Sequence, residues 1–130
     1  MIRRRGVAIV ENSKGILVVA GHSKKFMLPG GGANRWESRK RATIRELYEE
    51  TGLKTNKITY LFSHLGNKWK GHGGNIIRNN SKVFWVKTYG EARPRSEIKH
   101  IDYWKPKSKF HLSQGAKEII EKYLDLKGRQ

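Results

Sequence analysis

Short apolar runs separated by turn-forming residues dominate the first part of the chain. Residues 7–10 and 16–20 are aliphatic and largely β-branched, and the stretch between them contains Asn, Ser and Gly, which favour a turn. This pattern predicts a hairpin. Residues 26–28 form a further short extended piece, because Leu28 precedes Pro29 and is biased away from helix. Three glycines follow directly.

Between residues 38 and 51 the apolar spacing becomes helical. Ser38 can cap the start, and Gly52 suits the left-handed position that ends many helices. Four residues share the face that we expect to pack: Ile44, Leu47, Tyr48 and Thr51. A second helix is predicted near the end, where Ser113 can cap a periodic run and residues 127–129 terminate it. Its apolar positions are Ala116, Ile119, Ile120, Tyr123 and Leu124.

Two further strands are predicted between the helices, at residues 58–65 and 83–89. Residues 66–75 and 90–96 are polar and are predicted as loops, and residues 71–75 fit a plain turn better than a mobile loop over a substrate. Strands interleaved with two helices predict an α/β fold. A length of 130 residues suits one domain, so we expect residues 1–130 to form a single unit.

Composition narrows the chemistry. The chain has no cysteine, which excludes disulfides, thiolate nucleophiles and cysteine-based metal sites. Its 28 Lys and Arg against 11 Asp and Glu give a formal net charge of +17, which favours an anionic partner. Neither a signal-peptide core nor a membrane-length apolar stretch is present, so we expect a cytoplasmic protein without a membrane partner.

Three glutamates on the first predicted helix carry the candidate chemistry. At 3.6 residues per turn, Glu46, Glu49 and Glu50 fall within an arc of about 100°, and the apolar set lies roughly opposite. Crowded carboxylates repel one another unless cations neutralise them, and their oxygens are the ligands that Mg²⁺ prefers. A trio of this kind is usually only a solvated face, so the surrounding residues must decide.

Those surroundings resemble the signature of the Nudix hydrolases. Between Gly31 and Leu53 the chain reads GGANRWESRKRATIRELYEETGL, with five residues between Gly31 and Glu37 and seven between Glu37 and Arg45. All nine signature positions match: Gly31, Glu37, Arg45, Glu46, Leu47, Glu49, Glu50, Gly52 and Leu53. The resemblance implies a Nudix fold, in which a mixed β-sheet lies between α-helices and the signature forms a loop–helix–loop.

The resemblance also implies a metal centre that holds Mg²⁺ or Mn²⁺. Glu46 and Glu50 are the expected direct ligands and Glu49 a further one, and the carbonyl of Gly30 can join them. Glu37 is expected as a supporting carboxylate. Histidines are not expected to contribute, because His64, His72, His100 and His111 have no mutual ligand spacing.

Catalytic and substrate-binding roles follow from the same resemblance. Arg45 is expected to turn toward carboxylates such as Glu37 and orient them. Glu46 is the leading candidate for the general base, and Glu97 in a later loop is the alternative. Three residues near the start of the signature are the expected substrate contacts: Gly31, Gly32 and Trp36.

This chain departs from the family pattern at two places. Arg35 and Trp36 stand where an acidic residue and a glycine are common, and residues 20–22 lack a basic residue that is common after the second strand. Trp36 has three interpretations: it shields the site, it stacks on a base, or it packs into the fold, and packing is the leading one.

The motif predicts hydrolysis of a phosphoanhydride bond in a phosphorylated small molecule. The main hypothesis is a nucleoside diphosphate linked to another moiety, as in a nucleoside triphosphate, dinucleoside polyphosphate, nucleotide sugar or capped RNA end. An inositol pyrophosphate is an alternative substrate that also fits the charge. A nucleic-acid-binding module on the same scaffold is a second hypothesis, favoured by tryptophans among basic residues. The intact glutamates favour catalysis.

Overall fold

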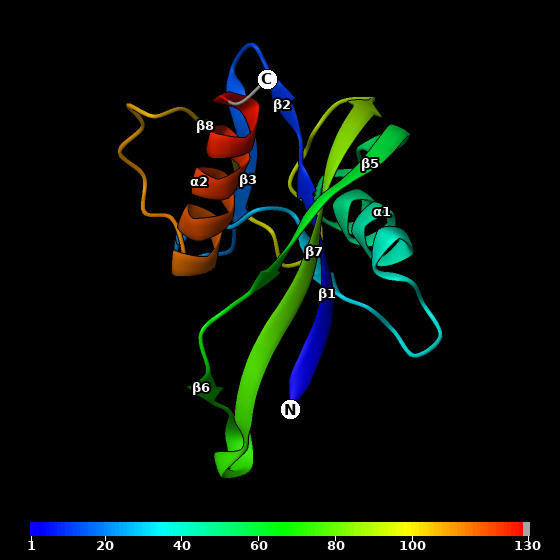
Figure 1. Ribbon diagram of the computed structural model, residues 1–130. Coiled ribbons are helices and arrows are strands. Elements are labelled where there is room, and N and C mark those ends of the chain that lie inside the picture. The colour runs from blue at the N-terminus through cyan, green and yellow to red at the C-terminus, as the bar shows by residue number, and fades with distance from the viewer. Residues whose placement is uncertain (129–130) are drawn as a thin grey trace.

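The computed structural model describes residues 1–128. A five-stranded sheet runs between two helices, α1 (Arg39–Thr51) and α2 (Gln114–Gly128) (Figure 1). Its strands are ordered β4 (Gly30–Gly32), β1 (Ile2–Ile9), β7 (Ile76–Tyr89) and β5 (Lys54–Leu65), and β6 (Trp69–Lys70) pairs with the start of β7. A three-stranded sheet of β2 (Glu11–Asn12), β3 (Gly15–Ala20) and β8 (His100–Trp104) lies beside α2.

The larger sheet is mixed. Strands β1 and β7 run parallel, and β4, β5 and β6 pair antiparallel with their neighbours. A short 3₁₀ turn, η1 (His72–Gly74), joins β6 to β7. The expectation of an α/β fold with a mixed sheet between helices is therefore confirmed. Within residues 1–128, neither helix is long and apolar enough to cross a membrane.

Each face of the larger sheet packs on its own apolar cluster. The cluster on the α2 side joins the sheet to β3 through the buried residues Val7, Ile9, Ile16, Val18, Val83, Ile119 and Ile120. The cluster on the α1 side contains Ala8, Val10, Leu17, Leu47, Leu53, Phe84 and Val86. Because successive side chains of a strand point to opposite faces, β1 and β7 contribute to both clusters.

The first helix begins and ends where the sequence predicts, but its buried face differs. Ser38 Oγ accepts a hydrogen bond from the Arg41 N–H, and Gly52 takes the left-handed conformation at φ 77°. Tyr48, expected to pack, is 42% exposed, and Ile44 is only half-buried, whereas Glu50 is 7% exposed. The prediction that Tyr48 packs is therefore wrong, and Glu50 is buried although it lies on the carboxylate face of α1.

Strand predictions held in kind but not in extent. The turn at residues 13–14 forms, yet only Val10 of the first apolar run bonds to the second, because β1 turns away to pair with β4 and β7. Strands β5 and β7 start earlier than predicted, at Lys54 and Ile76. The first part of β7, residues 76–82, carries few buried apolar side chains and so has no strand-like hydrophobic pattern. The sequence pattern does not predict strand β8, which pairs with β3. Strand β6 and turn η1 lie within residues 66–75, which were predicted as a loop.

Later parts of the chain agree with the sequence. Residues 26–28 are extended, with Met27 bridging to Val19 and Phe26 to Leu112. Ser113 Oγ accepts a hydrogen bond from the Ala116 N–H and caps α2. The expected helix-terminating segment reaches residue 129, which lies outside the described residues. Near the end of α2, Lys127 contacts Glu11 at 2.9 Å and ties the helix to β2.

Helix α1 lies unusually close to β1 at a glycine. A Cβ at Gly6 would overlap the carbonyl oxygen of Arg39 and the hydroxyl of Thr43, both of which belong to α1. Thr43 is fully buried and its hydroxyl donates to the same Arg39 carbonyl at 2.8 Å. This close approach sets the distance between the helix and the strand.

We expect Gly6→Ala to lower the free energy of unfolding by about 2–3 kcal/mol, since the added methyl group must displace helix backbone. Gly115→Ala is the matched control, because a Cβ at Gly115 meets nothing within 4 Å and alanine favours a helix. Urea unfolding of the two variants measures both effects. Equal stabilities would show that α1 does not depend on the glycine.

Candidate active site

The glycines of β4 receive two glutamates of α1. The Gly30 N–H donates to Glu50 Oε1 at 3.0 Å. A Cβ at Gly31 would lie 2.8 Å from each carboxylate oxygen of Glu46, so that carboxylate rests directly against the glycine backbone. A side chain at residue 31 would push Glu46 away. The helix therefore brings the carboxylates of two successive turns onto the strand that precedes it.

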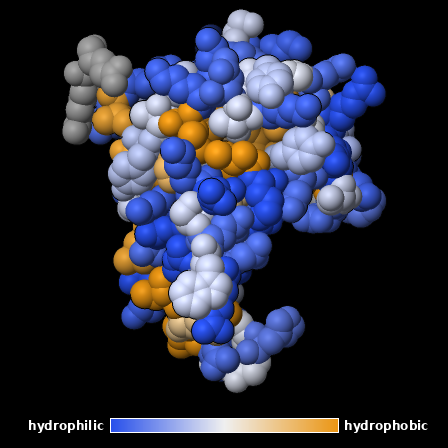
Figure 2. All heavy atoms as spheres, turned by 90° about the vertical axis from the view of Figure 1, so that its right-hand side faces the viewer, coloured by the Kyte–Doolittle hydropathy of each residue, from blue (hydrophilic) through white to orange (hydrophobic). Residues whose placement is uncertain are grey.

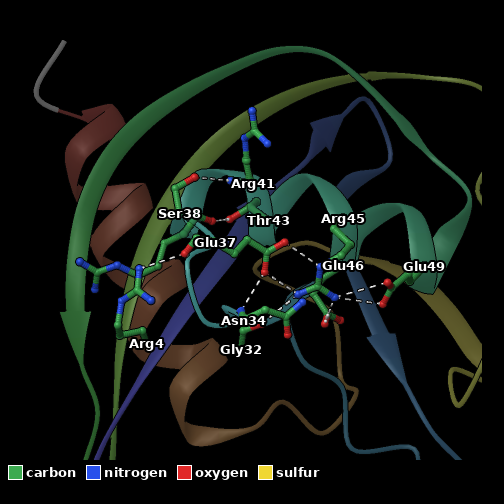
Figure 3. A network of polar contacts seen from close by, with 11 residues as sticks. Arg4, Gly32, Asn34, Glu37, Ser38, Arg41, Thr43, Arg45, Glu46 and Glu49 are labelled. Atoms are coloured by element: carbon green, nitrogen blue, oxygen red, sulfur yellow. Dashed lines mark hydrogen bonds and ion pairs between the residues drawn. The ribbon is translucent and has the colours of Figure 1, made fainter.

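Arg45 lies at the centre of a network of acidic groups (Figure 3). Its Nε and Nη2 donate to the two carboxylate oxygens of Glu37 at 2.8 and 2.9 Å. Its Nη1 donates to Glu46 at 2.9 Å and to Glu49 at 3.3 Å, and Nη2 also donates to the Gly32 carbonyl at 3.0 Å. The expected pairing with Glu37 is present, and Arg45 also reaches Glu46.

Glu37 is held as a carboxylate by this network. Hydrogen bonds from Arg45, and then one from the Asn34 N–H, lower the pKa of Glu37 to about 2. The same contacts raise the pKa of Arg45 above its usual range, with the hydrogen bonds to Glu37 as the main cause. Glu37 and Arg45 thus form a fixed ion pair that braces the loop before α1.

Glu50 has the opposite environment. Burial, as the main cause, together with the nearby charges of Glu46 and Glu97, raises the pKa of its carboxyl to about 8 against the lowering effect of the Gly30 N–H. Without a cation beside it, Glu50 therefore holds its proton at neutral pH. A strongly shifted acid near other carboxylates is typical of functional sites.

A cavity opens beside Glu50 and includes the later-loop glutamate. Its volume is about 470 Å³, within the range of small-molecule sites, and it is lined by Glu50, Glu97, Lys25 and His22 among others. The structure thus brings Glu97 to the predicted site. Lys25 supplies a cation near residues 20–22, where a basic residue common in the family is absent, and only its charge marked it in the sequence.

A second cavity lies on the α2 side of the sheet and contains groups that sequence reasoning missed. It is lined by Arg5, Val7, Leu28, His64, Asn79 and Ile119 among others. Within residues 1–128, Arg5 Nε, His64 Nδ1 and Asn79 Oδ1 are buried without a hydrogen-bond partner. His64 Nε2 lies 2.9 Å from Glu118. Met27 lines both cavities, so the two are neighbours.

Buried polar atoms without partners are costly, and each calls for a ligand or water. The second cavity has a volume of about 90 Å³, which exceeds the space that one water needs several-fold. Arg5 connects it to the glutamates: burial lowers the pKa of Arg5, while the charges of Glu50 and Glu46 oppose that shift. The cavity therefore adjoins the carboxylate site.

Trp36 does not pack into the fold. Its side chain is 91% exposed, and the guanidinium of Arg35 lies 5.3 Å from its ring. The leading interpretation of this residue is therefore wrong. Its φ of 70° explains why a glycine suits this position, because few side chains adopt that conformation without strain. Gly32, another expected substrate contact, accepts a hydrogen bond from Arg45 through its carbonyl oxygen.

The donor set suits a hard divalent cation, although the side chains do not converge on one. Within residues 1–128, no three acidic or histidine side chains form a metal-binding group. Arg45 holds Glu37, Glu46 and Glu49, and the Gly30 N–H holds Glu50. However, Glu46 and Glu97 each oppose the charged form of Glu50, and carboxylate oxygens are the donors that Mg²⁺ or Mn²⁺ takes. The residues present fit such an ion.

Comparisons with known proteins agree with this geometry. A family model described as NUDIX domain matches residues 1–124. A solved structure of a nudix hydrolase family member from Chromobacterium violaceum is 35% identical, with a TM-score of 0.80 over 97% of this chain and 79% of that one. No curated protein matches the chain.

Two more distant structures share the fold. The E. coli ORF135 protein is 22% identical, with a TM-score of 0.77 over 99% of this chain and 93% of that one. An ADP-ribose pyrophosphatase from Streptococcus suis is 20% identical, with a TM-score of 0.69 over 98% of this chain and 92% of that one.

We expect Arg45→Lys to lower the free energy of unfolding by about 1–2 kcal/mol at pH 7, because an ammonium cannot bind both oxygens of Glu37. The pKa of Glu37 is lowered on folding, so this stabilisation is fully present above about pH 4.5 and lost as pH falls toward 2. Arg41→Lys on the exposed side of α1 is the control. An NMR titration in which Glu37 keeps its low pKa in the lysine variant would contradict the assignment.

Glu50 makes the opposite prediction in metal-free protein. Its pKa is raised on folding from 4.5 to about 8, so its contribution to stability is fully present below pH 4.5 and declines as pH rises to 8. We expect Glu50→Gln to remove this decline, so that the variant gains on the wild type between pH 5 and 8. Urea unfolding in chelator at several pH values measures it, and parallel pH profiles would refute it.

Proposed function

The chain belongs to the Nudix family of pyrophosphate-bond hydrolases, and we propose that it hydrolyses a nucleoside diphosphate linked to another moiety with the help of Mg²⁺ or Mn²⁺. We propose residues 1–130 as one such domain. The observation that carries the proposal is the placement of Glu46 and Glu50 against the β4 glycines, beside a cavity that Glu50 lines together with Glu97 and Lys25.

The ion would be held mainly by Glu46 and Glu50. Glu49 and the Gly30 carbonyl are further donors, and Glu37 supports the set through Arg45. A bound divalent ion neutralises phosphate oxygens and makes a water more acidic. Glu50 must lose its proton to bind the ion, because its pKa is about 8 in the metal-free protein. Metal binding should therefore release a proton near neutral pH.

Other residues supply the remaining parts of the reaction. Glu46 is the leading general base for the attacking water, and Glu97, which lines the cavity beside Glu50, is the alternative. Arg45 is a positioning residue, because its guanidinium fixes the directions of Glu37, Glu46 and Glu49. Lys25 lines the cavity and would attract the phosphates of the substrate.

The second cavity favours a nucleobase over an inositol ring. Its unpartnered Arg5 Nε, His64 Nδ1 and Asn79 Oδ1 can pair with a polar ring edge, while Val7 and Ile119 supply apolar walls. A base has polar edges and an apolar face, whereas an inositol ring carries polar groups all round. Apolar walls with a few polar groups are typical of sites for flat heterocycles. The substrate phosphates would then lie past Met27, beside Glu50.

A substrate panel tests this function. It contains nucleoside triphosphates, dinucleoside polyphosphates, nucleotide sugars including ADP-ribose, and inositol pyrophosphates, each assayed by phosphate or pyrophosphate release with Mg²⁺ or Mn²⁺. We expect turnover of at least one nucleotide and loss of turnover in excess chelator. Turnover that persists in chelator would refute the metal mechanism, and turnover of inositol pyrophosphates alone would refute the nucleotide assignment.

Glu46→Gln separates catalysis from binding. The substitution keeps the size of the side chain and removes the charge that a metal ligand or a base requires, so we expect kcat to fall by roughly 10²-fold or more. The fold should persist, because the Glu46 side chain is only partly buried. Glu121→Gln on α2 is the matched control, since that glutamate is exposed and distant in the sequence. A variant that melts normally and turns over at the wild-type rate would remove Glu46 from the mechanism.

A further inference from the structure

One end of the larger sheet projects beyond both helices. The projection, which we call the arm, consists of residues 65–79 with the start of β1 paired beside them (Figure 1). Figure 2 shows it as a narrow extension below the body of the domain. Half of the exposed large apolar side chains among residues 1–128 lie on it: Met1, Ile2, Leu65, Trp69 and Ile76. The apolar clusters of the body do not include them.

The sheet that forms the arm is basic throughout. Residues 1–10 and 54–90 contain ten lysines and arginines and no aspartate or glutamate. All acidic residues of the chain lie elsewhere, and four of them are in the signature. With an uneven distribution of this kind, the positive field is concentrated on the arm and on strands β1, β5 and β7, where it attracts a polyanion.

Cations and an aromatic ring alternate on the arm. Trp69 stands between Lys68 and Lys70, all three are exposed, and the guanidinium of Arg3 lies 5.9 Å from the Trp69 ring. A strand of nucleic acid presents the same alternation, because its phosphates meet cations while its bases stack on rings. Cation–ring contacts such as that of Arg3 also contribute to such surfaces.

The strand register continues this surface toward the second cavity. Trp69 is paired with Ile77, Arg3 with Asn79, and Arg5 with Ser81. Paired residues, and every second residue along a strand, point to the same face, so Trp69, Arg3, Asn79 and Arg5 share one face of the sheet. Asn79 and Arg5 line the cavity, so the arm leads into it.

Other occupants fit less well. A second copy of the chain would bring two acid-free basic surfaces together, which is unfavourable. A bilayer needs a single apolar face, but Ile76 and Trp69 lie on opposite faces of the arm, because Trp69 is paired with Ile77.

We propose that the arm binds a single-stranded polynucleotide that crosses the edge of the sheet at β6, with Trp69 stacking on a base and Arg3 contacting a phosphate on one face. Lys70 is paired with Ile76 and points to the opposite face, so Lys68 and Lys70 contact phosphates where the strand passes around this edge. This binding does not depend on the proposed hydrolysis, so it can be measured without metal. A strand held in this way would run along the face that leads to Arg5 and the cavity.

Fluorescence anisotropy of a labelled oligouridylate of about twelve nucleotides, titrated with the full chain in chelator, tests the proposal. Trp69→Ala should raise Kd about tenfold, and Trp69→Phe, which keeps a stacking ring, should restore most of the affinity. Replacing Lys68 and Lys70 with alanine should make the slope of log Kd against log salt shallower by about 1.4, as loss of two phosphate contacts requires.

Lys107→Ala with Lys109→Ala is the matched control, because it removes the same charge from an exposed loop outside the arm. Thermal melting shows whether each variant is folded, and Trp69→Phe decides if Trp69→Ala melts early. The proposal fails if both lysine pairs change the slope equally, or if Trp69→Phe and Trp69→Ala bind like the wild type. It also fails if Trp69 instead controls dimer formation in solution, or if anionic vesicles compete away the oligonucleotide through Trp69.

Discussion

The architecture of the site depends on how closely α1 approaches the sheet. At Gly6 the backbone of β1 lies directly against α1, and at Gly31 the backbone of β4 lies against the Glu46 side chain, while Gly30 packs on Gly6 and Val7 of β1. The same closeness brings the carboxylate of Glu46 against Gly31 and lets the Gly30 N–H donate to Glu50. The packing contact that holds α1 on the sheet therefore also determines where its acidic side chains lie.

Two acids of the signature, Glu37 in the loop before α1 and Glu50 on the helix, experience opposite electrostatics. Glu37 is neutralised by the Arg45 guanidinium and is a carboxylate at nearly any pH, whereas Glu50 is buried with like charges around it and keeps its proton until about pH 8. The ion pair fixes geometry, whereas Glu50 stays neutral at neutral pH unless a cation beside it favours its charged form.

Local features of the site could be predicted from the sequence. The caps at Ser38 and Gly52 and the spacing of the glutamates act within one helix, so periodicity and motif were sufficient. The burial of Glu50 could not be predicted, because it depends on which side of α1 meets the β4 glycines. The second cavity was missed for a related reason: Arg5, His64 and Asn79 come from three strands and meet only through their register. None of them stands in a local pattern.

Strand β1 serves both halves of the molecule through alternate residues. Gly6 and Ala8 face α1, while Arg3, Arg5 and Val7 face the cavity and the arm. During divergence of related chains, the second set can therefore vary and change ligand preference while the first set keeps the helix in place. An insertion of one residue within β1 would exchange the two sets and abolish both the helix packing and the ligand contacts. Evolution can therefore substitute residues of the second set in this strand but cannot change the length of the strand.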